Sequence, residues 1–152
     1  MKEPDEKYDC LKLGRQLCFP LYAASRQITR QYTPFLSELG ITYTQYIALM
    51  VLWEKRPVTV KELGDALRLD TGTMTPLLKK MEKEGLITRT RSERDNRVVE
   101  IDLTDRGWAL REKAVEVPEK MIRCGSSLTQ EEAAELFRLL YKLMDGKKET
   151  VE

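Results

Sequence analysis

Apolar residues recur every three or four positions through the first half of the chain, which is the spacing of one helix face. Residues 11–39 predict one long helix, in which Pro20 either causes a kink or marks the true start, and Pro34 disturbs the end. Three shorter helices are predicted to follow. Their apolar positions are Tyr46, Leu49, Met50 and Trp53 in the first, Val60, Leu63 and Leu67 in the second, and Met74, Leu77, Leu78 and Met81 in the third.

Polar residues and turn formers are expected to begin and end these three helices. Thr44 is suited to cap the first of them, and Pro57 should end it. Candidate caps at the start of the third helix are Asp70, Thr71 and Thr73. Gly85 should stop that helix, and Pro76 fits it only in the first turn, where the missing N–H costs little.

The pattern then changes from helical spacing to alternation. Residues 87–91 (ITRTR) and 98–103 (VVEIDL) predict two short strands. The polar segment between them, SERDNR, has the Asp-Asn chemistry of a hairpin tip. A fifth helix is predicted from its cap, Thr104, to about Ile122, with a bend near Pro118.

Thr129 and Glu132 form a capping box for a last helix. Its apolar positions are Ala133, Leu136, Phe137, Leu140, Leu143 and Met144. The order of elements predicts a mainly α fold (α+β), a winged helix-turn-helix flanked by long terminal helices. We divide it into an N-terminal dimerisation helix over 1–40, a DNA-binding region over 41–103 and C-terminal dimerisation helices over 104–152.

The composition limits the possible functions. The 152 residues are 41% hydrophobic and 34% charged, which is typical of a soluble globular domain without a membrane span. The charged start lacks the apolar stretch of a secretory signal, so a cytoplasmic protein is expected. The chain has no histidine, and its three cysteines are too scattered for a zinc site. We therefore expect neither an enzyme nor a metal or other cofactor.

Basic and small polar side chains gather where a winged helix would contact DNA. Opposite the buried side of the helix around Met74 lie Pro76, Lys79, Lys80 and Lys83. The hairpin adds Arg89, Arg91, Arg94 and Arg97. Long guanidinium side chains there would reach an adjacent minor groove. The alternatives are a merely solvated helix face and a winged helix that binds protein rather than DNA.

The two ends of the chain carry more apolar residues than a small winged core needs. They are Leu11, Leu13, Met121, Ile122, Leu136, Leu139, Leu140 and Leu143. We favour a homodimer over the alternative that these residues complete the monomer core. A two-fold interface would place two recognition helices roughly 34–36 Å apart, which suits a palindromic double-stranded DNA.

Cys18 is a candidate redox site because Tyr22 follows it by one helical turn. A phenol that donates to a thiolate favours the charged sulfur and so increases its reactivity toward peroxide. Further phenols follow in the next stretch: Tyr32, Tyr43 and Tyr46. The alternative is an inert core cysteine, which is the commoner use of a single cysteine on an apolar helix.

Five segments closely resemble the MarR family and, more narrowly, its organic-hydroperoxide-sensing repressors of the OhrR type. They are QLCFPLYAASRQITRQYTPFL, ITYTQYIALMVLWE, LDTGTMTPLLKKMEKEGLITR, RDNRVVEIDLT and LREKAVEVP. The resemblance covers about residues 17–118. Its most specific parts are LCF-x-LYA and the TYTQY block, whereas the DNA-binding core is shared with the wider family.

The resemblance implies roles for individual residues. Cys18 matches the cysteine that peroxide oxidises, and Tyr22 matches a tyrosine of the same chain. Tyr32 and Tyr43 match tyrosines that reach the cysteine from the partner subunit. Positions of the family's recognition helix and wing are Asp70, Thr71, Thr73, Pro76, Lys80, Asp95 and Arg97. Cys124 lies about one residue beyond the usual place of a second, resolving cysteine, and Cys10 precedes the matched region.

The mechanism that the resemblance implies is redox-controlled repression. A reduced homodimer holds its operator, an organic hydroperoxide oxidises Cys18 to a sulfenic acid, and the dimer releases the DNA. The acid condenses either with Cys124 or with a low-molecular-weight thiol. One alternative is a MarR-type repressor released by a small phenolic or other ligand, with Cys18 structural. Another is a thiol peroxidase, although nothing in the sequence supports turnover.

Overall fold

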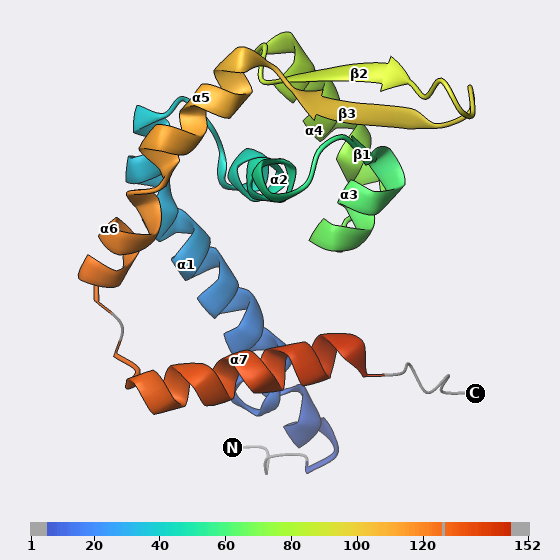
Figure 1. Ribbon diagram of the computed structural model, residues 1–152. Coiled ribbons are helices and arrows are strands. Elements are labelled where there is room, and N and C mark those ends of the chain that lie inside the picture. The colour runs from blue at the N-terminus through green and yellow to red at the C-terminus, as the bar shows by residue number, and fades with distance from the viewer. Residues whose placement is uncertain (1–5, 126, 147–152) are drawn as a thin grey trace.

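Helix α2, Tyr43–Glu54, lies at the centre of the fold (Figure 1). The structure is a computed structural model that describes residues 6–125 and 127–146. The buried residues of α2 are Gln45, Tyr46, Ala48, Leu49 and Leu52. Met50, which the sequence predicts to be buried, is 46% exposed. It lies on the same helix face as Glu54, one turn later, and this face points away from the core.

The cap of α2 is Thr42, so the prediction of Thr44 is wrong. The Gln45 N–H donates to Thr42 Oγ1 at 3.4 Å, and the Thr42 N–H donates to Gln45 Oε1 at 2.8 Å. This reciprocal pair is a capping box, and its Thr-x-x-Gln spacing was available in the sequence. Two threonines stand two residues apart here, and only Thr42 has a glutamine at the required distance.

Helices α3, Val60–Leu67, and α4, Thr71–Lys83, form the helix-turn-helix. Arg68 lies between them with φ 53°, a left-handed conformation that turns the chain between the two helices. The Thr73 N–H donates to Asp70 Oδ1 at 2.8 Å, which confirms Asp70 as a cap of α4.

Pro76 lies in the second turn of α4, so the prediction that it occupies the first turn is wrong. A proline at this position leaves the carbonyl of Gly72, four residues earlier, without its helical hydrogen bond. Gly72 and Pro76 are both exposed, so water can satisfy this carbonyl. The helix therefore continues through the proline at its solvent-facing side.

The wing consists of the antiparallel strands β2, Ile87–Arg91, and β3, Val99–Leu103, in a register that pairs Ile87 with Leu103. Both predicted strands are confirmed, although β3 begins one residue later than predicted. A third strand, β1, Val58–Thr59, pairs with β3 and gives the order β1-β3-β2. It was not predicted, because a strand of two residues contains no alternation to detect.

The predicted fifth helix is divided into α5, Asp105–Ala114, and α6, Val117–Arg123. Thr104 caps α5 as predicted, and its Oγ1 accepts a hydrogen bond from the Gly107 N–H at 3.0 Å. The bend expected near Pro118 is a break, because a proline in the first turn of α6 cannot continue the hydrogen bonds of the preceding helix.

Helix α1, Cys18–Glu38, begins later than predicted, after two 3₁₀ turns over Glu6–Leu11 and Leu13–Arg15. Pro20 lies in its first turn, which confirms the alternative that this proline marks the start. Pro34 lies inside α1 without ending it. Cys18 is therefore the first residue of a continuous helix of 21 residues.

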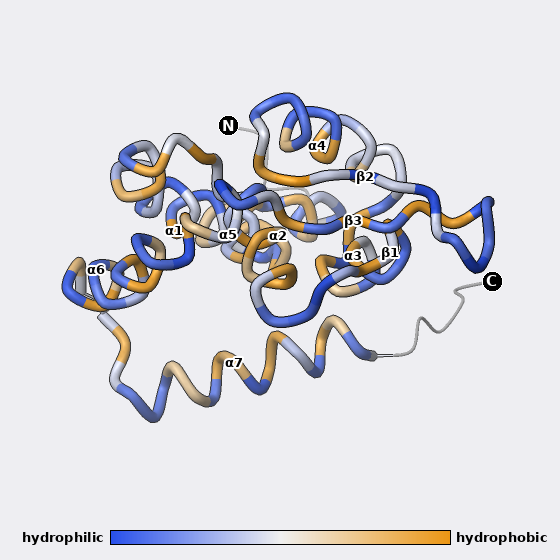
Figure 2. The backbone as a smooth tube through the Cα atoms, turned by 45° about the horizontal axis from the view of Figure 1, so that its top comes forward, coloured by the Kyte–Doolittle hydropathy of each residue, from blue (hydrophilic) through white to orange (hydrophobic). Residues whose placement is uncertain are grey.

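Helix α7, Gln130–Asp145, begins at the predicted capping box of Thr129 and Glu132. None of its residues is buried in the single chain. Figure 2 shows apolar and polar positions alternating along α7, which lies apart from the sheet. Its exposed large apolar residues are Leu136, Phe137, Leu139, Tyr141, Leu143 and Met144. This helix presents an apolar face that the chain itself does not cover.

Gly107 allows α5 to approach the chain just before β2. A Cβ atom at this position would lie 2.1 Å from the Leu86 carbonyl oxygen. The Gly107 carbonyl also accepts a hydrogen bond from Trp53 Nε1 at 3.0 Å, which joins α5 to the end of α2. Only a residue without a side chain permits this close approach.

We expect Gly107→Ala to lower the free energy of unfolding by about 1–3 kcal/mol, because α5 must move away from Leu86. Gly14→Ala is the matched control, since an added Cβ there meets no atom within 4 Å. It should change the free energy of unfolding by less than about 0.5 kcal/mol. Urea unfolding followed by tryptophan fluorescence measures both variants, and equal stabilities would contradict the close approach.

Candidate DNA interface and redox site

The outward face of α4 carries exposed positive charge. Its lysines are Lys79, Lys80 and Lys83. The Lys80 side chain is 56% exposed, and its Nζ lies 3.9 Å from Glu84 Oε1, so this ion pair is weak. The predicted positions nearer the start of the helix are exposed as well: Thr71, Thr73 and Pro76. One face of α4 thus combines small groups at its start with cations further along, as a recognition helix requires.

Asp70 holds the first turn of this helix in shape. Hydrogen bonds from the Thr73 backbone and side chain, and from the Gly72 backbone, keep the pKa of the Asp70 carboxyl below its usual range. The carboxylate is therefore charged at neutral pH and is already engaged as an acceptor. The Thr75 hydroxyl donates to the Thr71 carbonyl at 2.9 Å in the same turn. Asp70 thus makes a capping contact at the predicted DNA-facing end.

The tip of the wing presents its arginines to solvent. The Arg97 side chain is 91% exposed. Asp95 Oδ1 accepts hydrogen bonds from the Arg97 backbone N–H at 3.0 Å and from Arg97 Nε at 3.2 Å. These bonds lower the pKa of the Asp95 carboxyl from its usual value. The Arg94 side chain is exposed, while its backbone N–H donates to Ser92 Oγ at 3.3 Å.

All four wing arginines are expected from the sequence to reach the minor groove of DNA. Two of them make contacts within the chain instead. Arg89 donates to Glu82 Oε2 of α4 through Nε at 3.0 Å and through Nη2 at 2.5 Å. Arg91 Nη1 donates to the Asn96 carbonyl at 3.0 Å. Arg89 therefore fixes the wing against α4, and Arg91 fixes the wing tip.

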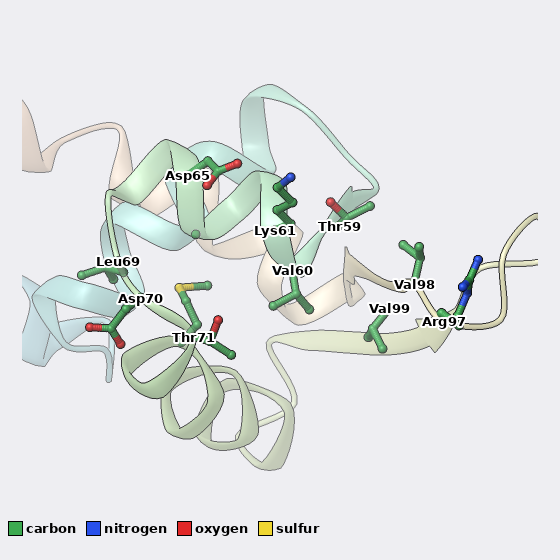
Figure 3. A pocket seen from close by; sticks show the side chains of 12 residues that line it. Thr59, Val60, Lys61, Asp65, Leu69, Asp70, Thr71, Arg97, Val98 and Val99 are labelled. Atoms are coloured by element: carbon green, nitrogen blue, oxygen red, sulfur yellow. The ribbon is translucent and has the colours of Figure 1, made fainter. Parts of the chain in front are cut away.

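A hollow of about 850 Å³ separates the helix-turn-helix from the wing. Figure 3 shows Arg97 at its wing side, Asp70 and Thr71 at the start of α4, and Lys61 and Asp65 on α3. Three of the predicted DNA-contacting residues, Asp70 and Thr71 of the helix start and Arg97 of the wing, therefore line one hollow.

Cys18 is exposed at the N-terminus of α1 and is a free thiol, as are Cys10 and Cys124. Tyr22 follows on the same face of the continuous helix and is 59% exposed. Its hydroxyl accepts a hydrogen bond from Arg26 Nη1 at 3.1 Å. Among the described residues, no hydrogen bond joins Cys18 to Tyr22. The hydroxyl proton of Tyr22 remains available for another acceptor.

Tyr32 of α1 packs against the start of α2 and forms a tyrosine cluster with Tyr43 and Tyr46. The ring centroid of Tyr32 lies 5.0 Å from that of Tyr43 and 5.9 Å from that of Tyr46. Burial raises the pKa of the Tyr43 and Tyr46 phenols, and the neighbouring Tyr32 raises both further. Both phenols therefore stay protonated at neutral pH and can act as hydrogen-bond donors.

The length of α1 keeps Cys18 away from the tyrosine cluster of its own chain. Fourteen residues of continuous helix separate Cys18 from Tyr32, which corresponds to about 21 Å. Cys124 ends α6, where Lys120 Nζ lies 3.8 Å from Glu38 Oε2 at the opposite end of α1. A single chain thus brings Tyr32 together with Tyr43, but it does not bring Cys18 to these tyrosines.

Sequence reasoning missed Gln45 and Glu84. Gln45 is 1% exposed, and its Nε2 donates to Glu84 Oε2 at 2.6 Å. The capping-box spacing from Thr42 would have identified Gln45 as a structural residue. No sequence signal connects it to Glu84, which is 39 positions away.

Neither a metal site nor a membrane-spanning helix is found in the described part of the chain. Residues 6–125 and 127–146 contain no group of histidine, cysteine, aspartate and glutamate side chains that could hold a metal ion. Within the same residues no single helix is long and apolar enough to cross a bilayer. Helices α1 and α2 meet the length and composition criteria only as a pair, and the chain bends by 74° between them.

A helix-turn-helix with exposed lysines on its second helix, followed by a two-stranded basic wing, defines a winged-helix DNA-binding protein. The model of the MarR family matches residues 41–99. The organic hydroperoxide resistance transcriptional regulator of Bacillus subtilis (strain 168) is 50% identical over 93% of this chain and 95% of its own length. The chain belongs to the MarR family and is a transcriptional regulator of the MarR type.

Two further relatives support this assignment. The HTH-type transcriptional regulator MgrA of Staphylococcus aureus is 45% identical over 92% of this chain and 95% of its own length. A structure of reduced AbfR bound to DNA is 35% identical with a TM-score of 0.74, and the match covers 91% of this chain and 96% of AbfR. AbfR, from Staphylococcus epidermidis, is also known in an overoxidised form bound to DNA and in a disulfide form.

Proposed function

We propose that the chain is a homodimeric repressor that holds a palindromic operator and releases it when an organic hydroperoxide oxidises Cys18. One observation carries this proposal: Cys18 is an exposed free thiol about 21 Å along α1 from Tyr32, so these groups can meet only across a boundary between two chains. The Bacillus relative, a regulator of organic hydroperoxide resistance, supports the choice of effector.

The dimer would form through the two ends of the chain. The apolar face of α7 is uncovered, and Leu11, Leu13 and Ile122 are 72%, 58% and 78% exposed. Exposed apolar area of this extent is typical of an interface rather than of a free surface. The partner's α1 would then place its Cys18 near Tyr32 and Tyr43, whose protonated phenols can donate to a thiolate.

The redox step is a two-electron oxidation of one sulfur. The Cys18 thiolate attacks the outer oxygen of the hydroperoxide, the O–O bond breaks, and the alkoxide leaves and takes up a proton as the alcohol. The Cys18 sulfenic acid that results then condenses with a second thiol, which forms a disulfide and releases water. The second thiol is either the partner's Cys124 or a low-molecular-weight thiol. The altered subunit boundary moves the two recognition helices out of the spacing that the operator requires.

The DNA contacts would come from α4 and the wing. The residues proposed to contact the operator are Thr71, Thr73, Pro76, Lys79, Lys80, Lys83, Arg94 and Arg97, with Asp70 and Asp95 holding the two segments in shape. Arg97 combines high exposure with a backbone fixed by Asp95, so it is the best placed to enter a minor groove.

A second candidate function is release by a small phenolic or carboxylate ligand, with Cys18 structural. A hollow of about 430 Å³ between α1 and α2 favours it, because its lining combines two guanidinium groups, Arg26 and Arg30, with Tyr43. This candidate and the redox proposal differ in whether release requires the Cys18 sulfur.

We expect Cys18→Ser to hold the operator at concentrations of cumene hydroperoxide that release the wild-type protein, because serine cannot form a sulfenic acid. Fluorescence anisotropy of a labelled operator measures release, and mass spectrometry locates the added oxygen. Cys10→Ser is the matched control and should release like the wild type. Release of DNA by the oxidant-treated Cys18→Ser protein would overturn the redox proposal in favour of another trigger.

Cys124→Ala distinguishes the two routes of disulfide formation. If Cys124 is the second thiol, the oxidised wild type migrates at twice the monomer mass on non-reducing electrophoresis, and the variant stays a monomer. We expect any disulfide between Cys18 and Cys124 to join two chains, because Cys18 begins α1, whereas Lys120, one turn before Cys124, lies beside Glu38 at the other end of α1. A monomeric band from the oxidised wild type, with the mass of an added small thiol, would instead assign the one-cysteine route.

Arg97→Ala should weaken operator binding and reduce the slope of log K against log salt concentration by about one unit, because one cation fewer displaces counterions from the DNA. Lys113→Ala, an exposed cation on α5 outside the helix-turn-helix and the wing, is the control and should leave the slope unchanged. Titrations of the operator at several salt concentrations measure both variants. If Arg97→Ala and the wild type have the same slope, the tip of the wing does not contact the DNA.

A further inference from the structure

A buried hydrogen bond joins the tyrosine cluster to the recognition helix. Gln45 lies in the first turn of α2, between Tyr43 and Tyr46, and its side chain is almost fully enclosed. Its Oε1 accepts a hydrogen bond from the Thr42 backbone, and its Nε2 donates to Glu84 Oε2 at 2.6 Å. Both ends of the Gln45 amide are therefore fixed, one within α2 and the other on the neighbouring helix.

Glu84 is the residue at which α4 ends, and three elements converge on it. Gln45 contacts its carboxylate from α2, and Lys80 of α4 approaches the same carboxylate at 3.9 Å. Arg106 Nη1 of α5 donates to the Glu84 backbone carbonyl at 2.6 Å. The C-terminal end of the recognition helix is thus held by α2 and by α5, the helix that leads toward α6 and α7.

We infer that Gln45 is a positioning residue that couples the redox site to DNA binding through its hydrogen bond with Glu84. The inference rests on the proposed function, because it assumes that oxidation changes the contacts of Tyr43. Tyr43 is the first residue of α2, two positions before Gln45. Movement of this turn displaces the Gln45 amide, and the displaced amide moves Glu84 and the lysine-bearing face of α4.

The chemistry of this bond makes it suited to transmit a displacement. An amide that donates to a carboxylate forms a charge-assisted hydrogen bond, which is short and directional. Gln45 is 1% exposed, so a broken bond would leave its amide N–H buried without a partner. Glu84 therefore follows Gln45 rather than separating from it when the start of α2 moves.

Exchanging the two side chains provides a test with matched controls. Gln45→Glu keeps the acceptor for the Thr42 N–H but sets a carboxylate against the Glu84 carboxylate, which is repulsive. Glu84→Gln keeps a hydrogen bond, because its amide oxygen can accept from Gln45. The double variant, Gln45→Glu with Glu84→Gln, restores the bond with donor and acceptor reversed. The double variant and Glu84→Gln both lack the carboxylate that lies near Lys80 in the wild type. A comparison of these two variants is therefore free of any effect of that lost charge.

The quantity to measure is the ratio of operator Kd between the oxidised and the reduced protein, with the rate of Cys18 oxidation measured in parallel by mass spectrometry. We expect the ratio to be about 2- to 30-fold smaller in Gln45→Glu than in the wild type, and so closer to one. Glu84→Gln and the double variant should keep the wild-type ratio. The oxidation rate should not change. Should Gln45→Glu fail to fold, Gln45→Met removes the bond without the like charge and takes its place.

The outcomes separate this inference from the proposed function. If the wild type itself keeps the operator after Cys18 is oxidised, the proposed function fails. If the wild type releases and Gln45→Glu weakens both forms by the same factor, the bond is merely structural and the inference is overturned. A ratio that falls in Gln45→Glu and recovers in the double variant supports the coupling.

Discussion

The close packing of α2 is the constraint on which the other parts of the molecule depend. Three of its residues have no exposed surface: Ala48, Leu49 and Leu52. Side-chain hydrogen bonds hold it near both ends, from Gln45 to Glu84 and from Trp53 to Gly107. A helix packed in this way cannot shift without displacing its neighbours. A displacement of its first turn would therefore be felt at the end of α4, and a displacement of its last turn at α5, which leads to the terminal helices.

The length of α1 explains why sensing would be a property of two chains. About 21 Å of helix separates Cys18 from Tyr32, and no side chain spans that distance. A dimer of winged helices recognises DNA by the spacing between its two recognition helices. A sensor assembled at the boundary between subunits acts on this spacing directly, whereas a sensor enclosed within one chain would need a further step to change it.

Sequence patterns correctly predicted those features that depend only on residues close together in the chain. Asp70 and Thr104 were identified as caps because a polar cap and the helix it begins are adjacent in the chain. The orientation of Met50 and the pairing of Arg89 with Glu82 were not predicted, because each depends on a neighbouring element that periodicity does not locate. The same limit applies to the redox site. Helical spacing suggested Cys18 with Tyr22, but only the resemblance implied that Tyr32 and Tyr43 reach the cysteine from the partner subunit, and a single chain does not bring Cys18 to them.

The number of wing arginines that are free to attract DNA affects how strongly this protein would hold its operator. The chain carries a net charge of only +1. Arg89 and Arg91 are occupied by contacts within the chain, so in the proposed interface the attraction to DNA would come from the three lysines of α4 and from Arg94 and Arg97. Each phosphate contact adds to a binding energy that falls with salt, so an interface with few contacts has a modest non-specific affinity. Most of the discrimination must then come from placing both recognition helices in register. In the proposed homodimer, a small change of that register would be enough to release the operator, without any need to neutralise its charge.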